Sequence, residues 1–552
     1  MPTPRTVVYR ARRIRTLDPM RPEATHVAVR DGRILAVGDL AACAAWGPHD
    51  LDERYVDAVL LPGFVEGHAH LSEGPIWDSP YVGWFDRRDP QGRVWNGLRS
   101  AEAVAERLRE ADAGLRSDGK PEREPLVAWG FDPIYAGGAR MTCRDLDRVS
   151  ATRPVVVSHA NGHLLTVNSA ALALGAVDRD CEVEGVMRFE DGTPNGELQE
   201  PAAMHLVLRK LGEIGVLRTM TVPGIGLFER LATLTGVTTS TDLVNRLGPA
   251  DVAVLEQATA RDDCAVRLLP AFQAFHGTHR AAEGAEHVRA LTAKNTDRLR
   301  FGLVKMMLDG SIQGFSARLR WPGYFNGAPN GIWVTAPAQY EADFETYHRA
   351  GLTVHTHTNG DEASEVAIEA IERVLARAPR PSHRHTLQHG QMIDAALFRR
   401  MRAQGLAANL FANHVWYWGD QHFETTMGPD RAERVDACAS ALAAGVTLAI
   451  HSDAPVTPLG PLHVAWCAVN RLTPKGRLLG ASERIGVLDA LRAITLGPAW
   501  TIGLDGEIGT IACGKRADFA ILADDPLEVA PEALKDVRVL GTVLSGRPFV
   551  AG

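Results

Sequence analysis

Two histidines stand two positions apart in the segment FVEGHAHL, which follows an apolar run ending in Pro62-Gly63. In a β-strand, residues i and i+2 face the same side, so His68 and His70 can direct two imidazole rings at one point. Imidazole nitrogen is a common ligand of divalent metals. The pair alone is equally compatible with two ordinary polar residues at the end of a strand, so other residues have to decide.

Residues with similar chemistry follow several later apolar segments. Lys305 lies in GLVKMML, His357 ends LTVHTHT, His389 ends HTLQH and Asp453 follows GVTLAIHS. Residues placed by chance would not occur so consistently at the ends of apolar runs. We therefore predict one metal site, with the ligands His68, His70, Lys305, His357, His389 and Asp453.

Lys305 is the least usual member, because it stands between Val304 and Met306. A buried charged lysine is costly unless it is paired or loses its proton. It can pair with Asp309, or its neutral amine can capture CO₂ as a carbamate, an anion able to bridge two divalent metals. The sequence does not distinguish a free lysine from a carboxylated one.

The other candidates also have structural alternatives. His389 can be a hydrogen-bonded core histidine, and Asp453 can cap a helix N-terminus. His355 lies two positions before His357, and His451 lies two positions before Asp453. In a strand, each pair would face the same side. Of the first pair, His357 is the better candidate ligand because it lies closer to the strand end, whereas the role of His451 stays open.

The elements that carry these residues alternate between apolar runs and helical segments such as EASEVAIEAIERVLARA. Repeated βα units with apolar strands predict a parallel sheet, and eight units predict an α/β fold of the closed (β/α)₈ TIM-barrel type. Such barrels carry their chemistry at the C-terminal ends of the strands. The eight predicted strands are 59–70, 236–243, 266–275, 300–310, 352–361, 385–390, 405–414 and 445–455.

Both ends of the chain contain short strand-like runs, with a hairpin turn predicted at Asp31-Gly32. They predict one small β-sandwich domain built from both termini. The first two barrel strands are about 165 residues apart, so we expect an insertion over the barrel mouth that shapes a substrate pocket. The predicted boundaries are 1–58 and 506–552 for the β-sandwich, 59–505 for the barrel, and about 72–230 for the insertion.

Composition excludes several classes of protein. The 552 residues carry a net charge of −8 and no long run of Lys or Arg, which argues against a nucleic-acid partner. The N-terminus lacks the apolar core of a signal peptide, and we find no stretch long enough for a membrane span. Seven scattered cysteines without a C-x-x-C pair indicate reduced thiols, so a cytoplasmic protein is expected.

The motifs PGFVEGHAH, VKMMLDGS, HTHTNGD, LQHGQ and IHSDAPV, in this order, resemble those of the amidohydrolase superfamily. The chain is most similar to the family 3 branch, which includes YtcJ-like proteins and N-substituted formamide deformylase. The segment NGHLLTVNSAAL fits that branch too, and the resemblance extends over nearly the whole chain. Glu66-Gly67 and Asn359 depart from the commoner motifs, which bears on substrate preference.

This resemblance implies a set of roles. His68 and His70 would bind the more buried metal together with Asp453, His357 and His389 would bind a second metal, and carboxylated Lys305 would bridge the two. In the insertion, His163 would contact the substrate or its developing oxyanion. The metal would be Zn²⁺, as one or two ions, although Fe²⁺, Mn²⁺ and Co²⁺ suit such ligands as well.

The chemistry that follows is hydrolysis of a carbon–nitrogen bond in a small amide-type substrate, such as an N-substituted formamide, by metal-activated hydroxide. Asp453 would transfer the proton from water to the leaving nitrogen. Trp416, Tyr417 and Trp418 are predicted to line the pocket for an apolar substituent. One alternative is a mononuclear deaminase of a heterocycle, and another is a scaffold without activity. A homodimer is expected from base rates alone.

Overall fold

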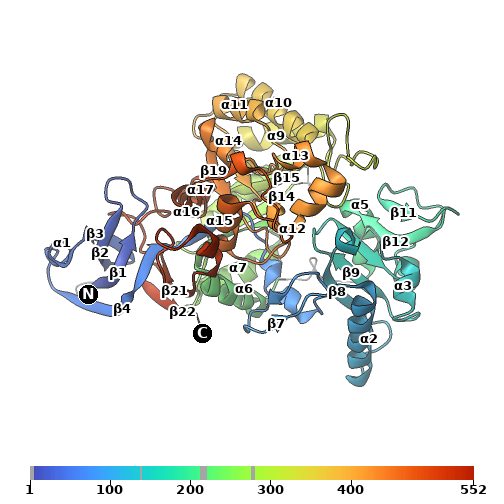
Figure 1. Ribbon diagram of the computed structural model, residues 1–552, viewed down its shortest axis with the longest axis horizontal. Coiled ribbons are helices and arrows are strands. Elements are labelled where there is room, and N and C mark those ends of the chain that lie inside the picture. Colours follow the sequence, from blue (N-terminus) through green and yellow to red (C-terminus); the bar gives the residue numbers. More distant parts are fainter. Residues whose placement is uncertain (1–4, 137–139, 212–219, 275–279, 552) are drawn as a thin grey trace.

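The computed structural model describes residues 5–136, 140–211, 220–274 and 280–551 (Figure 1). At its centre, eight parallel strands form one curled sheet with the order β19-β18-β17-β16-β15-β14-β13-β5, which confirms the predicted (β/α)₈ fold. The strands are β5 (Phe64–Glu66), β13 (Val237–Asn245), β14 (Arg267–Gln273), β15 (Leu303–Met307), β16 (Thr353–Thr358), β17 (Thr386–His389), β18 (Ala407–Leu410) and β19 (Thr447–Ile450).

The segments that follow the first and last barrel strands are hydrogen-bonded to each other. The amide of Asp453 donates to the carbonyl of His68 at 3.0 Å, and the amide of His70 donates to the carbonyl of Ala454 at 2.8 Å. Backbone groups that would otherwise be unpaired are therefore satisfied at this edge. The same bonds place the histidine pair beside Asp453.

The first predicted strand, 59–70, differs from the structure. It is divided into β4 (His49–Pro62), which belongs to another sheet, and the short barrel strand β5, which ends at Glu66. His68 and His70 therefore lie in the loop after β5 and not in a strand. Residue 275 of the strand predicted at 266–275 lies outside the described residues.

The helices of the βα units surround the sheet (Figure 1). In α10 (Asp361–Arg377), the buried residues Ala363, Ala367, Ile371 and Val374 recur every three or four positions and so form one apolar stripe against the core. The other helices of this ring include α6 (Val222–Thr235), α7 (Pro249–Ala260), α8 (Ala281–Leu291), α9 (Pro337–Arg349), α11 (Ala395–Gln404), α14 (Cys438–Ala443), α15 (Pro461–Asn470), α16 (Val487–Ala493) and α17 (Leu496–Thr501).

Strands from both chain ends meet in a second sheet, as predicted. Its seven strands are hydrogen-bonded in the order β22-β21-β20-β4-β1-β2-β3, and Tyr9, Leu60 and Phe519 share its core. Besides β4, the strands are β1 (Thr6–Arg15), β2 (Glu23–Arg30), β3 (Arg33–Gly38), β20 (Phe519–Leu522), β21 (Val539–Leu544) and β22 (Arg547–Val550).

The insertion between β5 and β13 has its own sheet of five strands, at the right of Figure 1. The strand order is β11-β12-β10-β9-β8, and α5 (Glu200–Leu211) leads from it toward the barrel. The strands are β8 (Leu126–Phe131), β9 (Val155–His159), β10 (Leu164–Val167), β11 (Val186–Arg188) and β12 (Pro194–Gln199).

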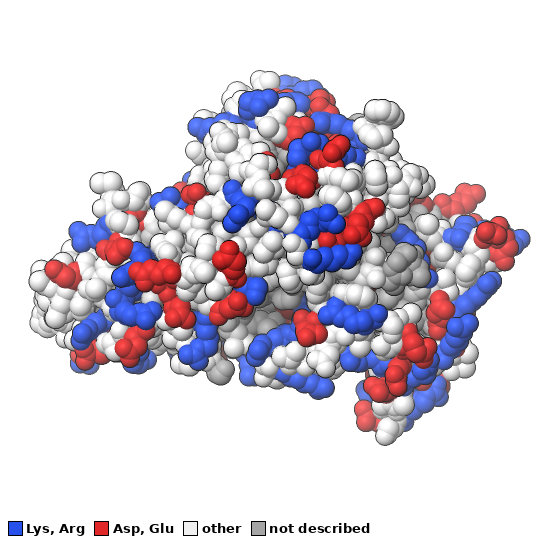
Figure 2. Space-filling model, in the orientation of Figure 1, with Lys and Arg blue, Asp and Glu red and all other residues white. Residues whose placement is uncertain are grey.

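Basic and acidic side chains are interspersed on the surface. On the face seen in Figure 2, neither Lys and Arg nor Asp and Glu gather into one extended patch. Within the described ranges, no helix combines the length and apolar character needed to cross a membrane.

A chain of three buried histidines joins α9 to the segment before β17. His385 accepts at Nδ1 from the Val354 amide (3.0 Å) and donates from Nε2 to His348 Nδ1 (2.9 Å). His348 then donates from Nε2 to the Ala378 carbonyl (2.7 Å), while His383 accepts from the His385 amide and donates to another backbone carbonyl. Each ring has one donor and one acceptor nitrogen in use, so all three are neutral.

This chain predicts that acid destabilises the fold. Burial lowers the pKa of His348, His383 and His385, so an unfolded chain binds protons near pH 6.5 that the native chain does not. The neutral histidines therefore contribute to the free energy of unfolding above that pH. Below it, this free energy falls by up to about 1.4 kcal/mol for each histidine and for each unit of pH.

The measurement is the free energy of unfolding between pH 7.5 and pH 5. The His348→Gln variant keeps an acceptor for His385 and a donor for Ala378 but does not titrate. We expect its stability to fall less steeply with acid than that of the wild type. Equal slopes for the two proteins would show that His348 has no part in the effect.

Candidate metal centre

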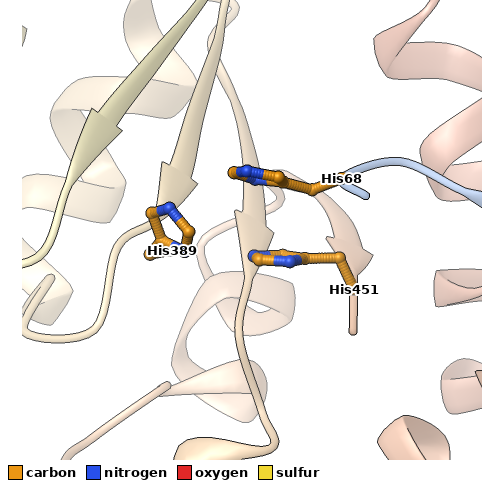
Figure 3. A group of neighbouring side chains, drawn as sticks. All are labelled: His68, His389 and His451. Atoms are coloured by element: carbon orange, nitrogen blue, oxygen red, sulfur yellow. The ribbon is translucent and has the colours of Figure 1, made fainter. Parts of the chain in front are cut away.

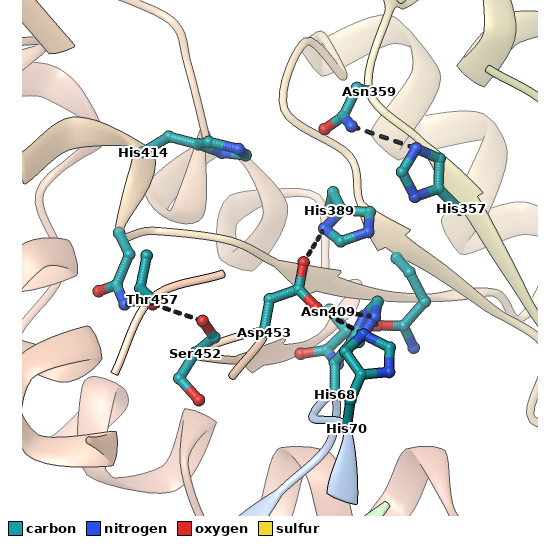
Figure 4. A network of polar contacts seen from close by, with 12 residues as sticks. His68, His70, His357, Asn359, His389, Asn409, His414, Ser452, Asp453 and Thr457 are labelled. Carbon is teal, nitrogen blue, oxygen red and sulfur yellow. Dashed lines mark hydrogen bonds and ion pairs between the residues drawn. The ribbon is translucent and has the colours of Figure 1, made fainter. Parts of the chain in front are cut away.

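Four of the predicted ligands are in direct contact at the C-terminal end of the barrel, and Figure 4 shows three of them, His68, His70 and Asp453. Asp453 Oδ1 lies 3.1 Å from His70 Nε2 and 3.2 Å from His68 Nε2. Lys305 belongs to β15, and its Nζ lies 3.2 Å from His68 Nε2. Residues from the first, fourth and eighth strand positions therefore converge, as the sequence predicted.

His389 and His357 complete the group. The Nδ1 atom of His389 lies 3.7 Å from Asp453 Oδ2, and its ring centroid lies 4.6 Å from that of His68. The ring centroid of His357 is 4.4 Å from that of His389. All six predicted ligands thus belong to one cluster of side chains.

Hydrogen bonds on the far side of the cluster fix the orientation of His68. Its Nδ1 donates to Gln388 Oε1 at 2.8 Å, an oxygen that also accepts from Asn409 Nδ2, and Nε2 is therefore free to face Asp453. The Gln388 amide in turn donates to His355 Nδ1, and His355 Nε2 donates to the Thr501 carbonyl. Both ring nitrogens of His355 are thus occupied, which excludes it as a metal ligand in this arrangement.

The ring of His357 is held from the opposite side. Its Nε2 donates to the carbonyl of Gly310 at 3.1 Å, and Asn359 Nδ2 donates to the same carbonyl at 2.8 Å. This leaves Nδ1 as the nitrogen of His357 available to a metal. Asn359, one of the departures from the commoner motif, therefore lies beside a candidate ligand.

His451 is fully buried, and neither ring nitrogen has a hydrogen-bond partner among the described residues. Its nitrogens lie within 4.8 Å of those of His68 and His389, so the three can also be considered as a metal-binding group (Figure 3). However, its ring lies parallel to that of His68, with centroids 4.5 Å apart and an interplanar angle of 17°. Lone pairs of parallel stacked rings do not point at one ion, so stacking support is the better assignment.

The donor atoms fit a divalent metal. His68, His70 and Asp453 offer two imidazole nitrogens and a carboxylate oxygen that lie within 4.8 Å of one another, a set typical of zinc sites. The remaining nitrogen of His70, Nδ1, is buried, has no hydrogen-bond partner among the residues that the structure describes, and lies 3.9 Å from Asp242 Oδ1. A carboxylate behind an imidazole is the usual support of a metal-bound histidine.

The backbone is strained at two of these residues. His389 has φ 65° and Asp453 has φ 52°, the left-handed region that non-glycine residues rarely adopt. Such strain persists only where surrounding structure enforces it, and it clusters at functional sites. The strain therefore supports the assignment of both residues to the site.

Burial shifts the pKa values of the ionisable side chains in the cluster. Loss of solvation lowers the pKa of Lys305 to about 7, so a large fraction of its amine is neutral at physiological pH. It also lowers the pKa of His68, His357 and His389 well below the usual range, which keeps their nitrogens free to bind metal. Burial alone would raise the pKa of Asp453, but the adjacent imidazoles outweigh it and keep the carboxylate ionised.

Glu66 connects the two segments that carry the histidine pair and Asp453. Its carboxylate accepts from the hydroxyl of Ser452 at 2.6 Å and from the amide of His68 at 3.2 Å. It is buried, and the resulting loss of solvation raises its pKa to about 8. Glu66 is therefore a support for the loops of the cluster and does not itself point into it.

A cavity of about 290 Å³ opens beside the cluster and extends under the insertion. His163, from the insertion, is one of its lining residues, with its ring centroid 5.2 Å from that of His357. Burial opposes the charged form of His163, but the carboxylate of Glu200 outweighs this and raises its pKa. Apolar side chains form much of the remaining wall, namely Leu71, Pro75, Ile76, Trp129, Met204, Leu208, Met220, Val244, Pro455 and Val456.

The three aromatic residues predicted to contact the substrate lie elsewhere. Trp416, Tyr417 and Trp418 belong to α12 (His414–Gln421) and are not among the described residues that line the cavity. Trp418 is buried and donates from its indole to Asp132 at 2.8 Å, because α12 packs against the insertion. Trp129 is the large aromatic side chain of the described cavity wall, so the lining gives no support to the predicted role of α12.

Sequence reasoning missed three polar residues that surround the site. Asp242 stands near the end of β13, and its position at a strand end was a usable signal. Gln388 precedes His389 in β17, but nothing in the sequence shows that its side chain reaches His68. Glu200 lies in the insertion, far from any barrel strand, and only the folded chain brings it to His163.

Comparisons with known proteins agree with this geometry. The amidohydrolase family model matches residues 56–550. Among curated relatives, LONG AFTER FAR-RED 3 of Arabidopsis thaliana is 27% identical over 96% of this chain and 89% of its own length. The putative amidohydrolase YtcJ of Bacillus subtilis is 26% identical over 96% of both chains. The N-substituted formamide deformylase of Arthrobacter pascens is 26% identical over 97% of this chain and 96% of its own.

Solved structures share the fold. A metal-dependent hydrolase from Pyrococcus horikoshii superposes with a TM-score of 0.70 at 18% identity, over 95% of this chain and 99% of its own. The atrazine chlorohydrolase TrzN from Arthrobacter aurescens, solved with zinc, superposes with a TM-score of 0.52 at 15% identity, over 99% and 95%. These likenesses show a common architecture for the barrel and the terminal sheet.

Proposed function

The chain belongs to the amidohydrolase family, and from that premise we propose that it hydrolyses the carbon–nitrogen bond of a small non-peptide amide with an apolar N-substituent. The enzyme is a metal-dependent hydrolase of this superfamily. The proposal on its substrate class is supported by one observation above all. The candidate metal ligands line the same cavity as a group of apolar side chains, which includes Ile76, Trp129, Met204 and Leu208.

The wall suits a hydrophobic group of moderate size. Ile76, Trp129, Met204 and Leu208 come from the insertion and contribute apolar surface, each at least nine-tenths buried. Pockets of this kind bind an apolar group by its burial and use a few polar groups for orientation. N-substituted formamide deformylase, one of the relatives, acts on substrates of this chemical class by its name.

We propose that His68, His70 and Asp453 hold one divalent metal and that His357 and His389 hold a second. Zinc is the best candidate, since the ligands are imidazole and carboxylate. A bound cation of this kind lowers the pKa of water and polarises a carbonyl oxygen. Lys305, whose Nζ lies 3.2 Å from His68 Nε2, would contribute an anion as its carbamate.

Formation of that carbamate needs a neutral amine, which the lowered pKa of Lys305 provides near pH 7. The Nζ lone pair forms a bond to the carbon of CO₂, one N–H proton is released, and the product is an anion. The side chain thus changes from a cation into a carboxylate-like ligand. A buried cation beside two groups of imidazole ligands is unfavourable, whereas an anion is favoured by metal binding.

The remaining steps belong to protein side chains. Asp453 is ionised, and we propose that it accepts a proton from the attacking water and returns it to the leaving nitrogen. His163 lines the same cavity, and because its Nδ1 donates to Glu200, its Nε2 would accept a hydrogen bond from the N–H of the substrate. The apolar wall would hold the N-substituent and exclude bulk water from the reacting bond.

A substrate screen with zinc-loaded protein tests the proposal. We expect release of a primary amine from N-formyl and N-acyl amines, with kcat/KM rising as the N-substituent grows from methyl to benzyl, because each buried methylene contributes about 0.8 kcal/mol. The assay follows amine and acid release by chromatography. A matched panel of small polar ureides and aminated heterocycles serves as the control.

Two outcomes would contradict the proposal. Ammonia release from a heterocycle, with no amine released from any amide, would assign the protein to the deaminase alternative. A preference for polar ureides over N-substituted amides would refute the role assigned to the apolar wall.

A further inference from the structure

Glu200 lies where the insertion meets the barrel. It is 3% exposed, and its carboxylate oxygens lie 2.9 and 3.1 Å from His163 Nδ1. The backbone repeats this link, because the amide of Glu200 donates to the carbonyl of His163 at 2.8 Å. The side chain and the main chain of Glu200 therefore both fix the residue that faces the cavity.

The position of the Glu200 carboxylate is tightly constrained. Its backbone has φ 61°, an unfavourable left-handed conformation for a glutamate. On the barrel side, a Cβ atom at Gly310 would lie 2.1 Å from Glu200 Oε1, so the carboxylate packs directly on this glycine. Strain at a buried, non-glycine residue persists when the surrounding structure or the function requires that residue.

The consequence concerns His163. Because Nδ1 donates to Glu200, Nε2 is the ring nitrogen that remains for other partners, and no described residue hydrogen-bonds to it. His163 lines the cavity, and the ring stands next to that of His357. A carboxylate that accepts from one nitrogen of a histidine sets both the tautomer and the direction of the other nitrogen.

We propose that Glu200 is a positioning residue, which holds His163 with its proton on Nδ1 and directs the lone pair of Nε2 into the cavity, where it accepts a hydrogen bond from the N–H of the substrate. This inference rests on the function proposed above and names a residue outside the metal-binding group. It differs from a purely structural role, in which Glu200 only attaches the insertion to the barrel. The two roles predict different effects on stability and on kcat.

Three substitutions separate them. Glu200→Gln keeps an oxygen that accepts from Nδ1, Glu200→Ala removes it, and Glu200→Gly removes it and also relieves the left-handed strain. We expect kcat to fall by about 10- to 100-fold in the Ala and Gly variants, with KM changed less than about threefold, as for other groups that orient a site residue. The Gln variant should retain most of kcat.

Stability and metal content distinguish positioning from structure. The Glu200→Gly variant should have a Tm equal to or above that of the wild type while its kcat is low, and its zinc content should be unchanged. Ala176→Gly is the matched control, since Ala176 is exposed, lies in the same insertion and has φ 52°. It should gain stability with no change in kcat.

The His163 ring itself provides a readout that needs no substrate. In ¹⁵N NMR of protein labelled at the imidazole nitrogens, the His163 signals are those absent from His163→Gln. They should report a proton on Nδ1 in the wild type and in Glu200→Gln, and a changed or mixed tautomer in Glu200→Ala.

An unchanged His163 tautomer in Glu200→Ala would overturn the inference, even if no substrate had been found. The inference would also be overturned if the variants lost kcat only in proportion to a loss of Tm or of zinc content. Failure of the proposed function would instead leave the substrate screen negative while the NMR result still decides whether Glu200 positions the ring.

Discussion

Replacing Asp453 by asparagine is expected to lower kcat/KM by about 10²- to 10⁴-fold, the usual contribution of a positioned proton-transfer group. Its Oδ1 is 3.1 Å from His70 Nε2 and 3.2 Å from His68 Nε2, so the substitution removes the negative charge on which both imidazoles converge. Asparagine matches aspartate in size and tolerates the left-handed φ of 52°. The fold should therefore remain intact, and zinc affinity should fall together with activity.

A matched control is available in Asp436. It is also a buried aspartate with a left-handed backbone, φ 46°, and it pairs with His414 at 3.2 Å outside the metal-binding group. Asp436→Asn should alter stability but leave zinc stoichiometry unchanged. Steady-state kinetics and metal analysis of both variants provide the measurement. An Asp453→Asn protein that kept more than a tenth of its activity would contradict the role given to this carboxylate.

Replacing Lys305 by methionine is expected to abolish most of the metal binding and, with it, the activity. Methionine fills a similar volume in the apolar strand β15, but it can form no carbamate. Native mass spectrometry of the wild type should show a mass increase equal to one CO₂, which is absent from Lys305→Met and is lost on acidification. Lys294→Met, at an exposed lysine paired with Glu256, is the control and should change neither mass increment nor zinc content.

An unmodified Lys305 in a fully active, zinc-loaded protein would refute the carbamate. Growth and purification in the presence and absence of added bicarbonate would show which state the protein requires.

The architecture and the proximity of the candidate ligands could be predicted because both depend on local patterns. Apolar runs followed by helical segments indicate βα units, and the C-terminal ends of parallel strands meet at one edge of the barrel. The positions of His357, His389 and Asp453 in the sequence therefore predict that these three side chains lie together. Even His68 and His70 converge as predicted, although they lie in a loop, because backbone bonds to the segment around Asp453 hold that loop in place.

What the sequence could not provide was the packing between distant parts. Residues that follow a barrel strand often line the pocket, and Trp416, Tyr417 and Trp418 follow one. Which face of a short helix meets the cavity, however, depends on the elements packed around that helix. Here Asp132 in the insertion accepts a hydrogen bond from Trp418 and draws this helix away from the lining. Glu200 was missed for the same reason, since its partner is set by the docking of the insertion.

The central claim is that His68, His70 and Asp453 bind a divalent metal at the mouth of the barrel. The most direct test is the zinc content of purified protein after dialysis, compared between the wild type and a His68→Asn/His70→Asn double variant with an unchanged circular dichroism spectrum. We predict one to two equivalents in the wild type and strongly reduced zinc in the variant. Equal zinc in the two proteins, or none in the wild type after exposure to zinc, would contradict the account.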